Sequence, residues 1–267
     1  MGYKMITRVK MVGAAAAVLM IITVAGIDTL LAQTARQSER LMVTIVNVKP
    51  DKVDEYERFV KNDTNPALQK AGIKWRDVWK TAMFGNSFEY VYVEPIDNFA
   101  MFDGPGPIER ALGKEGNAAW SVRSRSMINS VKRMQINTRP DLSYDGEGTR
   151  TPGVAVVTHA TAAQGRNAEL EAWVKAEMVP VMRQAKVPAY LVSQMGLGGN
   201  ANEYITLVMH ANMAELEKGP PVYRVMTKDA GDKIYAKLPA GVLVNVERYV
   251  VRFSPELSFR VGAAGAK

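Results

Sequence analysis

The two histidines of this chain are its strongest candidates for acid–base chemistry. An imidazole changes its charge near neutral pH, so it can move a proton in a reaction or bind a metal ion. His159 lies within an apolar run at residues 153–160, and His210 follows a second apolar run that begins at Tyr204. Histidines in strands more often have a hydrogen-bonded structural role. We therefore consider His159 as a catalytic base and His210 as a ligand-binding residue, with a structural role as the alternative for each.

Two acid–phenol pairs, Glu89-Tyr90 and Glu203-Tyr204, could line a pocket. Burial could raise the pKa of such a carboxylate towards values useful for acid–base catalysis. Tyr204 would then orient a substrate for His159. In the alternative, which we favour, each Glu sits in water at a strand edge and each Tyr packs as a strand former with its hydroxyl at the rim.

Two arginines, Arg133 and Arg248, could bind an anion. A planar guanidinium facing a pocket could hold an anionic ligand through paired hydrogen bonds. The alternative, which we favour, is an ion pair with an acid of a neighbouring strand. Arg248 is also a candidate for orienting a substrate.

Several other chemistries have no support in the residue types. The chain has no cysteine, which excludes disulfides, thiolate metal sites and cysteine nucleophiles. Metal-binding spacings such as HxH or HExxH are missing, and so are phosphate loops, nucleophile elbows and dinucleotide fingerprints. Haem needs an axial ligand, and neither histidine falls on a clearly helical segment. We therefore expect no metal and no cofactor.

The elements that must position these residues form an internal repeat. Tyr90 and Tyr204 are 114 positions apart, and the segments FGNSFEYVYV (84–93) and GGNANEYITL (198–207) align without a gap. The motifs RPDLSY (139–144) and SPELSF (254–259) then close two copies of one unit. In this alignment His159 and His210 replace isoleucines of the first copy, as expected of a site specialised in one copy.

Within each copy, periodicity predicts the order βαββαβ, which is that of a ferredoxin-like domain. Apolar runs at 41–48 and 153–160 predict first strands, and the helical pattern that follows each contains a proline, where the helix should kink or restart. The resulting organisation is a leader (1–32), a polar linker (33–40), a first repeat (41–144), a linker (145–153), a second repeat (154–259) and a tail (260–267).

The strands carry apolar residues on both faces, so both faces should be buried. The simplest way to bury them is to pack the open faces of the two sheets against each other within one chain. This α+β arrangement of two tandem ferredoxin-like repeats resembles the dimeric α/β barrel superfamily, and its pattern is most similar to the NIPSNAP-like and antibiotic-biosynthesis-monooxygenase-like branches. The resemblance implies a pocket between sheet and helices or inside the barrel. It also implies a cofactor-free oxygenase, an isomerase, a haem enzyme or a protein without known activity.

The N-terminus predicts export. Lys4, Arg8 and Lys10 precede an apolar run at 12–27, and Ala32, which stands before a polar stretch, suggests a loose cleavage site with Leu30 where a smaller residue is usual. An uncleaved membrane anchor is the alternative, although the run is shorter than the ~20 apolar residues that span a bilayer. The net charge of +7 is spread along the chain without Lys/Arg clusters among aromatics, so we expect no nucleic-acid partner.

These observations predict an exported periplasmic or secreted protein, a monomer or homodimer, that binds a small and largely apolar molecule. The second hypothesis is a cofactor-independent oxygenase or isomerase, which requires His159 to point into a cavity with a polar partner. The third is a structural or interaction protein, which requires a barrel filled by side chains.

Overall fold

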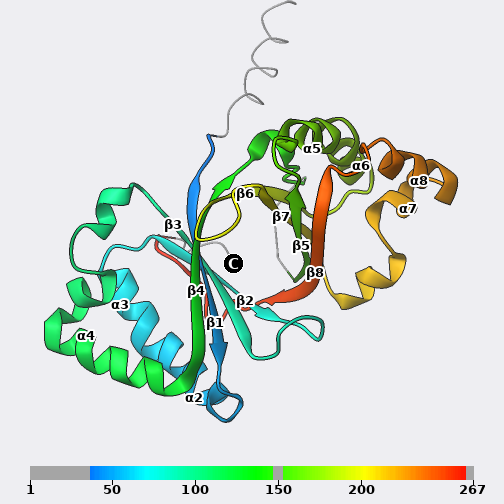
Figure 1. Ribbon diagram of the computed structural model, residues 1–267. Coiled ribbons are helices and arrows are strands. Elements are labelled where there is room, and N and C mark those ends of the chain that lie inside the picture. Colours follow the sequence, from blue (N-terminus) through cyan, green and yellow to red (C-terminus); the bar gives the residue numbers. More distant parts are fainter. Residues whose placement is uncertain (1–36, 147–152, 263–267) are drawn as a thin grey trace, which may run out of the picture. The chain divides into compact units, whose positions relative to one another are not determined.

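The computed structural model describes residues 37–146 and 153–262, and its helices and strands are shown in Figure 1. The predicted leader with its cleavage site lies outside the described residues, as does most of the predicted linker between the repeats. In the described ranges no helix is long and apolar enough to cross a membrane.

The first repeat has the predicted order βαββαβ. It consists of β1 (Arg40–Val48), η1 (Pro50–Lys52), α2 (Val53–Phe59), η2 (Val60–Thr64), α3 (Asn65–Lys70), β2 (Trp75–Thr81), β3 (Glu89–Pro95), η3 (Phe99–Phe102), α4 (Pro107–Met127), β4 (Ile128–Thr138) and η4 (Pro140–Leu142).

The second repeat follows the same order with a shorter final helical region. It consists of β5 (Val154–Ala162), α5 (Asn167–Trp173), η5 (Val174–Met178), α6 (Val179–Gln184), β6 (Tyr190–Leu197), β7 (Glu203–His210), η6 (Met213–Lys218), α7 (Pro221–Val225), α8 (Lys228–Ala236), β8 (Leu243–Phe253) and the short β9 (Phe259–Arg260).

The first helix of each repeat runs on past its proline instead of breaking. A π-helical turn, η2 or η5, precedes Pro66 and Pro180. Proline has no backbone N–H to donate to the preceding turn, and the wider π turn shifts the hydrogen-bond register just before it. The predicted kink is thus replaced by a local change of helix type at the same place in both copies.

The eight long strands form one closed antiparallel barrel. Their order is β3-β1-β4-β6-β7-β5-β8-β2, and β2 pairs with β3 to close the ring. The repeats join each other through the pairs β4–β6 and β2–β8. One chain therefore completes the barrel, and the predicted α+β fold of two ferredoxin-like repeats is confirmed.

Most strand residues are buried on both faces, as their composition predicts, but residues 129–133 of β4 and 244–248 of β8 are exposed. The face that points into the barrel carries an apolar cluster that includes Val43, Met134, Val157, Ile205 and Val251. The other face packs under helices, with α2 to α4 over the first repeat and α5 to α8 over the second (Figure 1). Alternation along each strand therefore sorts every residue into a barrel-facing or a helix-facing set.

The repeated motifs RPDLSY and SPELSF are reciprocal ties between the repeats. Leu142, which ends the first repeat, is buried in the core of the second, and Leu257 is buried in the core of the first. The hydroxyl of Ser143 accepts a hydrogen bond from Val192 N of β6, and that of Ser258 accepts one from Val78 N of β2. Each motif thus fastens the end of one repeat to the other.

Candidate functional site

A cavity of about 500 Å³ lies between the helix-facing side of the strands of the second repeat and the helices that cover them. Its wall is mostly apolar and includes Leu170, Trp173, Met178, Val208 and Leu238. The first repeat also contributes, because Phe84 from the β2–β3 hairpin and Leu142 from the crossing tail line the same cavity. This volume falls in the range of binding sites for small organic molecules.

Differences between the repeats create this space. Thr206 and Val208 stand where the first repeat has Tyr92 and Glu94. In the first repeat the Arg76 guanidinium lies 4.0 Å from the centre of the Tyr92 ring, and Arg76 Nε is 2.8 Å from Glu94 Oε1. The side chain of Tyr92 is fully buried. The second repeat lacks this large polar cluster at the same strand positions, and its smaller residues leave the cavity.

The two predicted tyrosines bind carboxylates of the first helix in their own repeat. The Tyr204 hydroxyl donates to Glu171 Oε1 at 2.5 Å, and the Tyr90 hydroxyl donates to Glu57 Oε1 at 2.6 Å. Arg139 also donates to Glu171, and this hydrogen bond lowers the pKa of the carboxyl. Burial, followed by the contact with Glu171, raises the pKa of Tyr204. Glu171 is therefore ionised and Tyr204 is a neutral donor.

His210 lies at one end of the cavity on β7. It is 4% exposed, and burial, followed by the charge of Arg224, lowers its pKa to about 4. Its ring has no hydrogen-bond partner among the described residues. His210 is therefore an uncharged polar group near neutral pH, and it is available to a ligand in the cavity.

His159 faces the opposite side of the same sheet, inside the barrel. Its Nδ1 contacts the Glu203 carboxylate, and its Nε2 is 3.1 Å from the Tyr249 hydroxyl. These groups adjoin a void of only about 70 Å³ whose wall includes Ile45. Burial, followed by the charges of Glu89 and Glu203, raises the pKa of Tyr249. His159 therefore has the expected polar partners, but the void beside it has room for little more than a few atoms.

The structure does not bring His159 and Tyr204 together at one site. In the β5–β7 ladder, His159 is opposite Ile205, and Tyr204 is opposite Ala160. Because neighbouring residues of a strand point to opposite faces, His159 and Tyr204 lie on opposite sides of the sheet. Arg248 lines the helix-side cavity as well, so neither predicted orienting residue shares a cavity with His159.

The remaining predicted residues are spread over three places. Glu203 belongs to the barrel-side group of His159, and Glu89 accepts a hydrogen bond from Asn86 near the β2–β3 turn. Tyr90 belongs to the filled first repeat, where Arg133 is exposed on β4. Neither arginine has the expected ion pair with an acid among the described residues. Groups of three His, Asp or Glu that could hold a metal are also lacking in this part of the chain.

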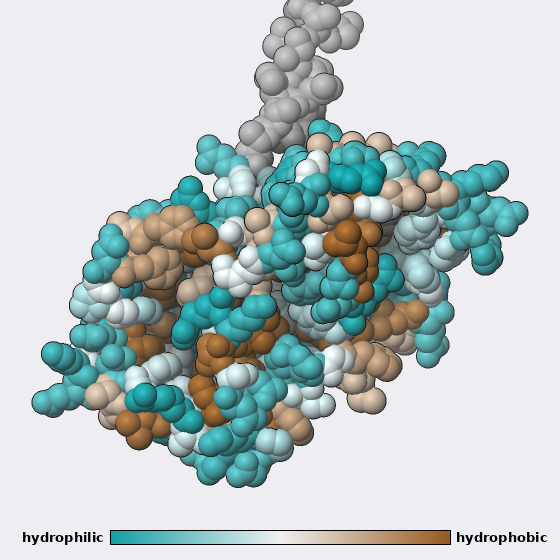
Figure 2. All heavy atoms as spheres, in the orientation of Figure 1, coloured by the Kyte–Doolittle hydropathy of each residue, from teal (hydrophilic) through white to brown (hydrophobic). Residues whose placement is uncertain are grey.

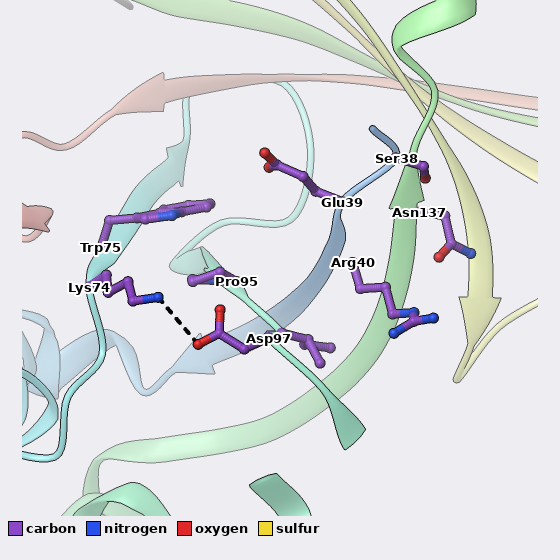
Figure 3. Close-up of a pocket in the computed structure, with 9 residues that line it drawn as sticks. Ser38, Glu39, Arg40, Lys74, Trp75, Pro95, Asp97 and Asn137 are labelled. Carbon is purple, nitrogen blue, oxygen red and sulfur yellow. Dashed lines mark hydrogen bonds and ion pairs between the residues drawn. The ribbon is translucent and has the colours of Figure 1, made fainter. Parts of the chain in front are cut away.

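A second, more polar pocket of about 550 Å³ lies at the start of β1, around Arg40, Lys74, Trp75 and Asp97. Figure 3 shows the Lys74 ammonium pointing to the Asp97 carboxylate, at 3.5 Å. Both side chains are about two-thirds exposed or more, so their attraction is weak in water. The helix-side cavity has an apolar wall with a few polar groups, which is typical of a small-molecule site, and is the better candidate.

Sequence reasoning missed the residues that distinguish this cavity. Thr158 and Thr206 lie on its floor, and Glu171 lies at its side, but none of the three was singled out. The signal was present in the repeat alignment, where Thr206 replaces a tyrosine of the first copy.

Comparisons with known proteins show the fold. No protein-family model matches the sequence, and no curated protein matches it closely enough to count as a relative. A candidate monooxygenase from Lactobacillus acidophilus NCFM is similar to it at a TM-score of 0.56 and 8% identity, over 84% of this chain and 97% of the other. A candidate monooxygenase from Fusobacterium nucleatum subsp. nucleatum ATCC 25586 is similar at a TM-score of 0.55 and 12% identity, over 82% of this chain and 94% of the other.

An anthrone oxidase-like protein is similar at a TM-score of 0.57 and 13% identity, over 87% of this chain and 98% of the other. At these identities the similarity shows the fold alone. It supports the dimeric α/β barrel fold that the tandem repeats resemble.

Proposed function

We propose that this protein binds a small, largely apolar molecule in the cavity of its second repeat. One observation carries the proposal: the helix-facing positions that Arg76, Tyr92 and Glu94 fill in the first repeat border an open cavity in the second. Protein interiors are normally close-packed, and voids larger than a water molecule are few. A cavity of about 500 Å³ beside an equivalent filled core is therefore best explained by a ligand.

The filled-barrel alternative fits less well. Its expectation was a core without room for a ligand, and the second repeat has such room. Export, the oligomeric state and the choice between the NIPSNAP-like and monooxygenase-like branches stay predictions from the sequence.

Oxygenase or isomerase activity is our second proposal. The contacts of His159 with Glu203 and Tyr249 favour it, because an acid that holds Nδ1 orients the ring for proton transfer at Nε2. The names of the structural neighbours also favour it. The small void on this side of the sheet places it second, since a substrate would need the barrel to open. Turnover that persists after His159→Ala would rule out this base.

The first proposal can be tested with N-phenyl-1-naphthylamine, a neutral apolar fluorophore that brightens in an apolar site. Thr206→Tyr restores the residue of the first repeat and fills the floor of the cavity. Ala119→Tyr adds the same ring at an exposed position of α4 and is the matched control. We expect one molecule of probe per chain, with at least a tenfold weaker affinity in Thr206→Tyr and no change in Ala119→Tyr.

Circular dichroism would verify that both variants fold. The proposal fails if folded Thr206→Tyr binds the probe as tightly as the original chain. It also fails if the original chain binds no probe and its native mass spectrum shows no retained molecule.

A further inference from the structure

Three polar side chains lie in one row on the floor of the second-repeat cavity. Thr206 of β7 pairs with Thr158 of β5, and Thr158 pairs with Arg248 of β8. All three line the cavity. Because hydrogen-bonded strands are spaced about 5 Å apart, two hydroxyls and a guanidinium lie within roughly 10 Å of each other. We call these three residues the polar row.

The members of the polar row are free to bind a ligand. Neither threonine hydroxyl has a hydrogen-bond partner among the described residues, and Arg248 has no ion pair there. The acid of the cavity wall, Glu171, already accepts hydrogen bonds from Arg139 and Tyr204. The Arg248 guanidinium therefore brings a positive charge without an ion-pair partner among the described residues to a cavity whose wall is mostly apolar.

Arg248 is placed at the water-facing margin of the cavity. Arg248 is exposed, whereas Thr158 and Thr206 are half-buried. Tyr235 of α8 lies close enough for the charge of Arg248 to oppose the rise in the pKa of Tyr235 that burial causes. A ligand can thus keep a charged group near water at Arg248 while its apolar part lies under the helices.

The other charged group of the cavity wall is more constrained. Arg224, beside the uncharged His210, already donates through Nε and Nη2 to the carbonyl oxygens of Gly219 and Glu215, each at 2.8 Å. The wall between the ends is built from large apolar side chains such as Trp173 and Met178. This arrangement fits a molecule with one anionic end and an apolar body.

We propose that the ligand is an amphipathic carboxylate whose carboxylate binds Arg248 with help from the Thr158 and Thr206 hydroxyls. This inference rests on the proposed function, since it names the chemical class of the molecule in the same cavity. A charge-assisted hydrogen bond to guanidinium is roughly twice as strong as a neutral one, and two parallel bonds add directional preference. The excess of basic over acidic residues adds a general attraction for anions.

The first repeat supplies the control for this proposal. Arg133 pairs with Thr44 on β4 and β1, which is the register of Arg248 with Thr158. There Tyr92 occupies the place of Thr206, and Thr44 is only 8% exposed. Arg133→Gln therefore removes the same charge at the same strand position where the helix-side space is filled.

The experiment is displacement of bound N-phenyl-1-naphthylamine by decanoate and by decan-1-ol, which differ only in the polar end. It is done at about pH 7.5, where a carboxylic acid is ionised. For Arg248→Gln we expect the affinity for decanoate to fall about tenfold and that for decan-1-ol to stay unchanged. Arg133→Gln should change neither affinity, and Arg248→Lys should recover part of the preference for decanoate.

The outcomes separate this inference from the proposed function. It is overturned if Arg248→Gln weakens decanoate and decan-1-ol equally, or neither of them. It is also overturned if Arg133→Gln weakens decanoate as much as Arg248→Gln does, because general charge attraction would then suffice. Failure of the original chain to bind the neutral probe would instead refute the cavity as a binding site, and this inference with it.

Discussion

The substitution His210→Ile should make the protein less sensitive to acid. Folding lowers the pKa of His210 from 6.5 to about 4, because burial disfavours the charged ring. The native state therefore keeps His210 neutral at pH values where the unfolded chain has already taken up a proton. The free energy of unfolding is therefore unaffected by His210 above pH 6.5, and it falls as the pH is lowered from 6.5 towards 4.

The loss of unfolding free energy in acid can be calculated from the pKa difference of His210 between the native and unfolded states. A difference of about 2.5 pKa units corresponds to about 3 kcal/mol in total, of which about 2 to 3 kcal/mol is already lost at pH 4.5. Isoleucine is a suitable replacement because Ile96 occupies the equivalent position in the first repeat and is 6% exposed. It removes the titrating group while keeping the site apolar.

The assay is urea unfolding of both proteins at pH 7 and at pH 4.5. The free energy of unfolding should fall between these pH values by about 2 kcal/mol more in the original chain than in His210→Ile. Other groups that titrate in this interval are common to both proteins and cancel in the comparison. An equal fall in both proteins would refute the assignment of a buried, neutral His210.

Two further sets of substitutions test the packing around the cavity. Leu142→Ala and Leu257→Ala should each lower the free energy of unfolding by about 2 to 5 kcal/mol in urea titrations, but only Leu142→Ala, at the cavity wall, should also alter the affinity for N-phenyl-1-naphthylamine. Equal effects of both on probe affinity would contradict the assignment of the cavity to the second repeat. Glu94→Val should lower the free energy of unfolding by about 3 to 5 kcal/mol, because it leaves the buried Arg76 without its carboxylate partner. Adding Arg76→Tyr gives the residues that the second repeat has at both positions and should recover much of the lost stability. A double variant less stable than Glu94→Val alone would show that the network is not what the second repeat has replaced.

The sequence was sufficient to predict the fold because the repeat is visible in spacing alone. Apolar residues on both strand faces implied two covered faces, and the duplicated motif marked the ends of two copies. The role of that motif in joining the two repeats could not be predicted from the sequence. Ser143 and Ser258 bond to strands of the other repeat, and which repeat a tail packs on depends on how the barrel closes.

The candidate site was predicted less well, for reasons of register and volume. Glu203 and Tyr204 are adjacent in one strand, so they cannot line the same pocket, and alternation alone could have shown this. The separation of His159 from Tyr204 additionally needed the pairing of β5 with β7. The cavity depends on the summed volume of residues from six or more elements, of which the change from Tyr92 to Thr206 was the part visible in the sequence.

The cavity belongs to the second repeat but cannot be complete without the first. Leu142 and Phe84 of the first repeat form part of its wall, and Arg139 holds the Glu171 carboxylate at its side. The first repeat, in turn, fills its own helix-side space with the network of Arg76, Glu94 and Tyr92. The strands of the second repeat are in turn hydrogen-bonded to those of the filled first repeat at both seams of the barrel, through the pairs β4–β6 and β2–β8. The closed barrel therefore keeps the strands below the cavity paired although the core above them is less densely packed.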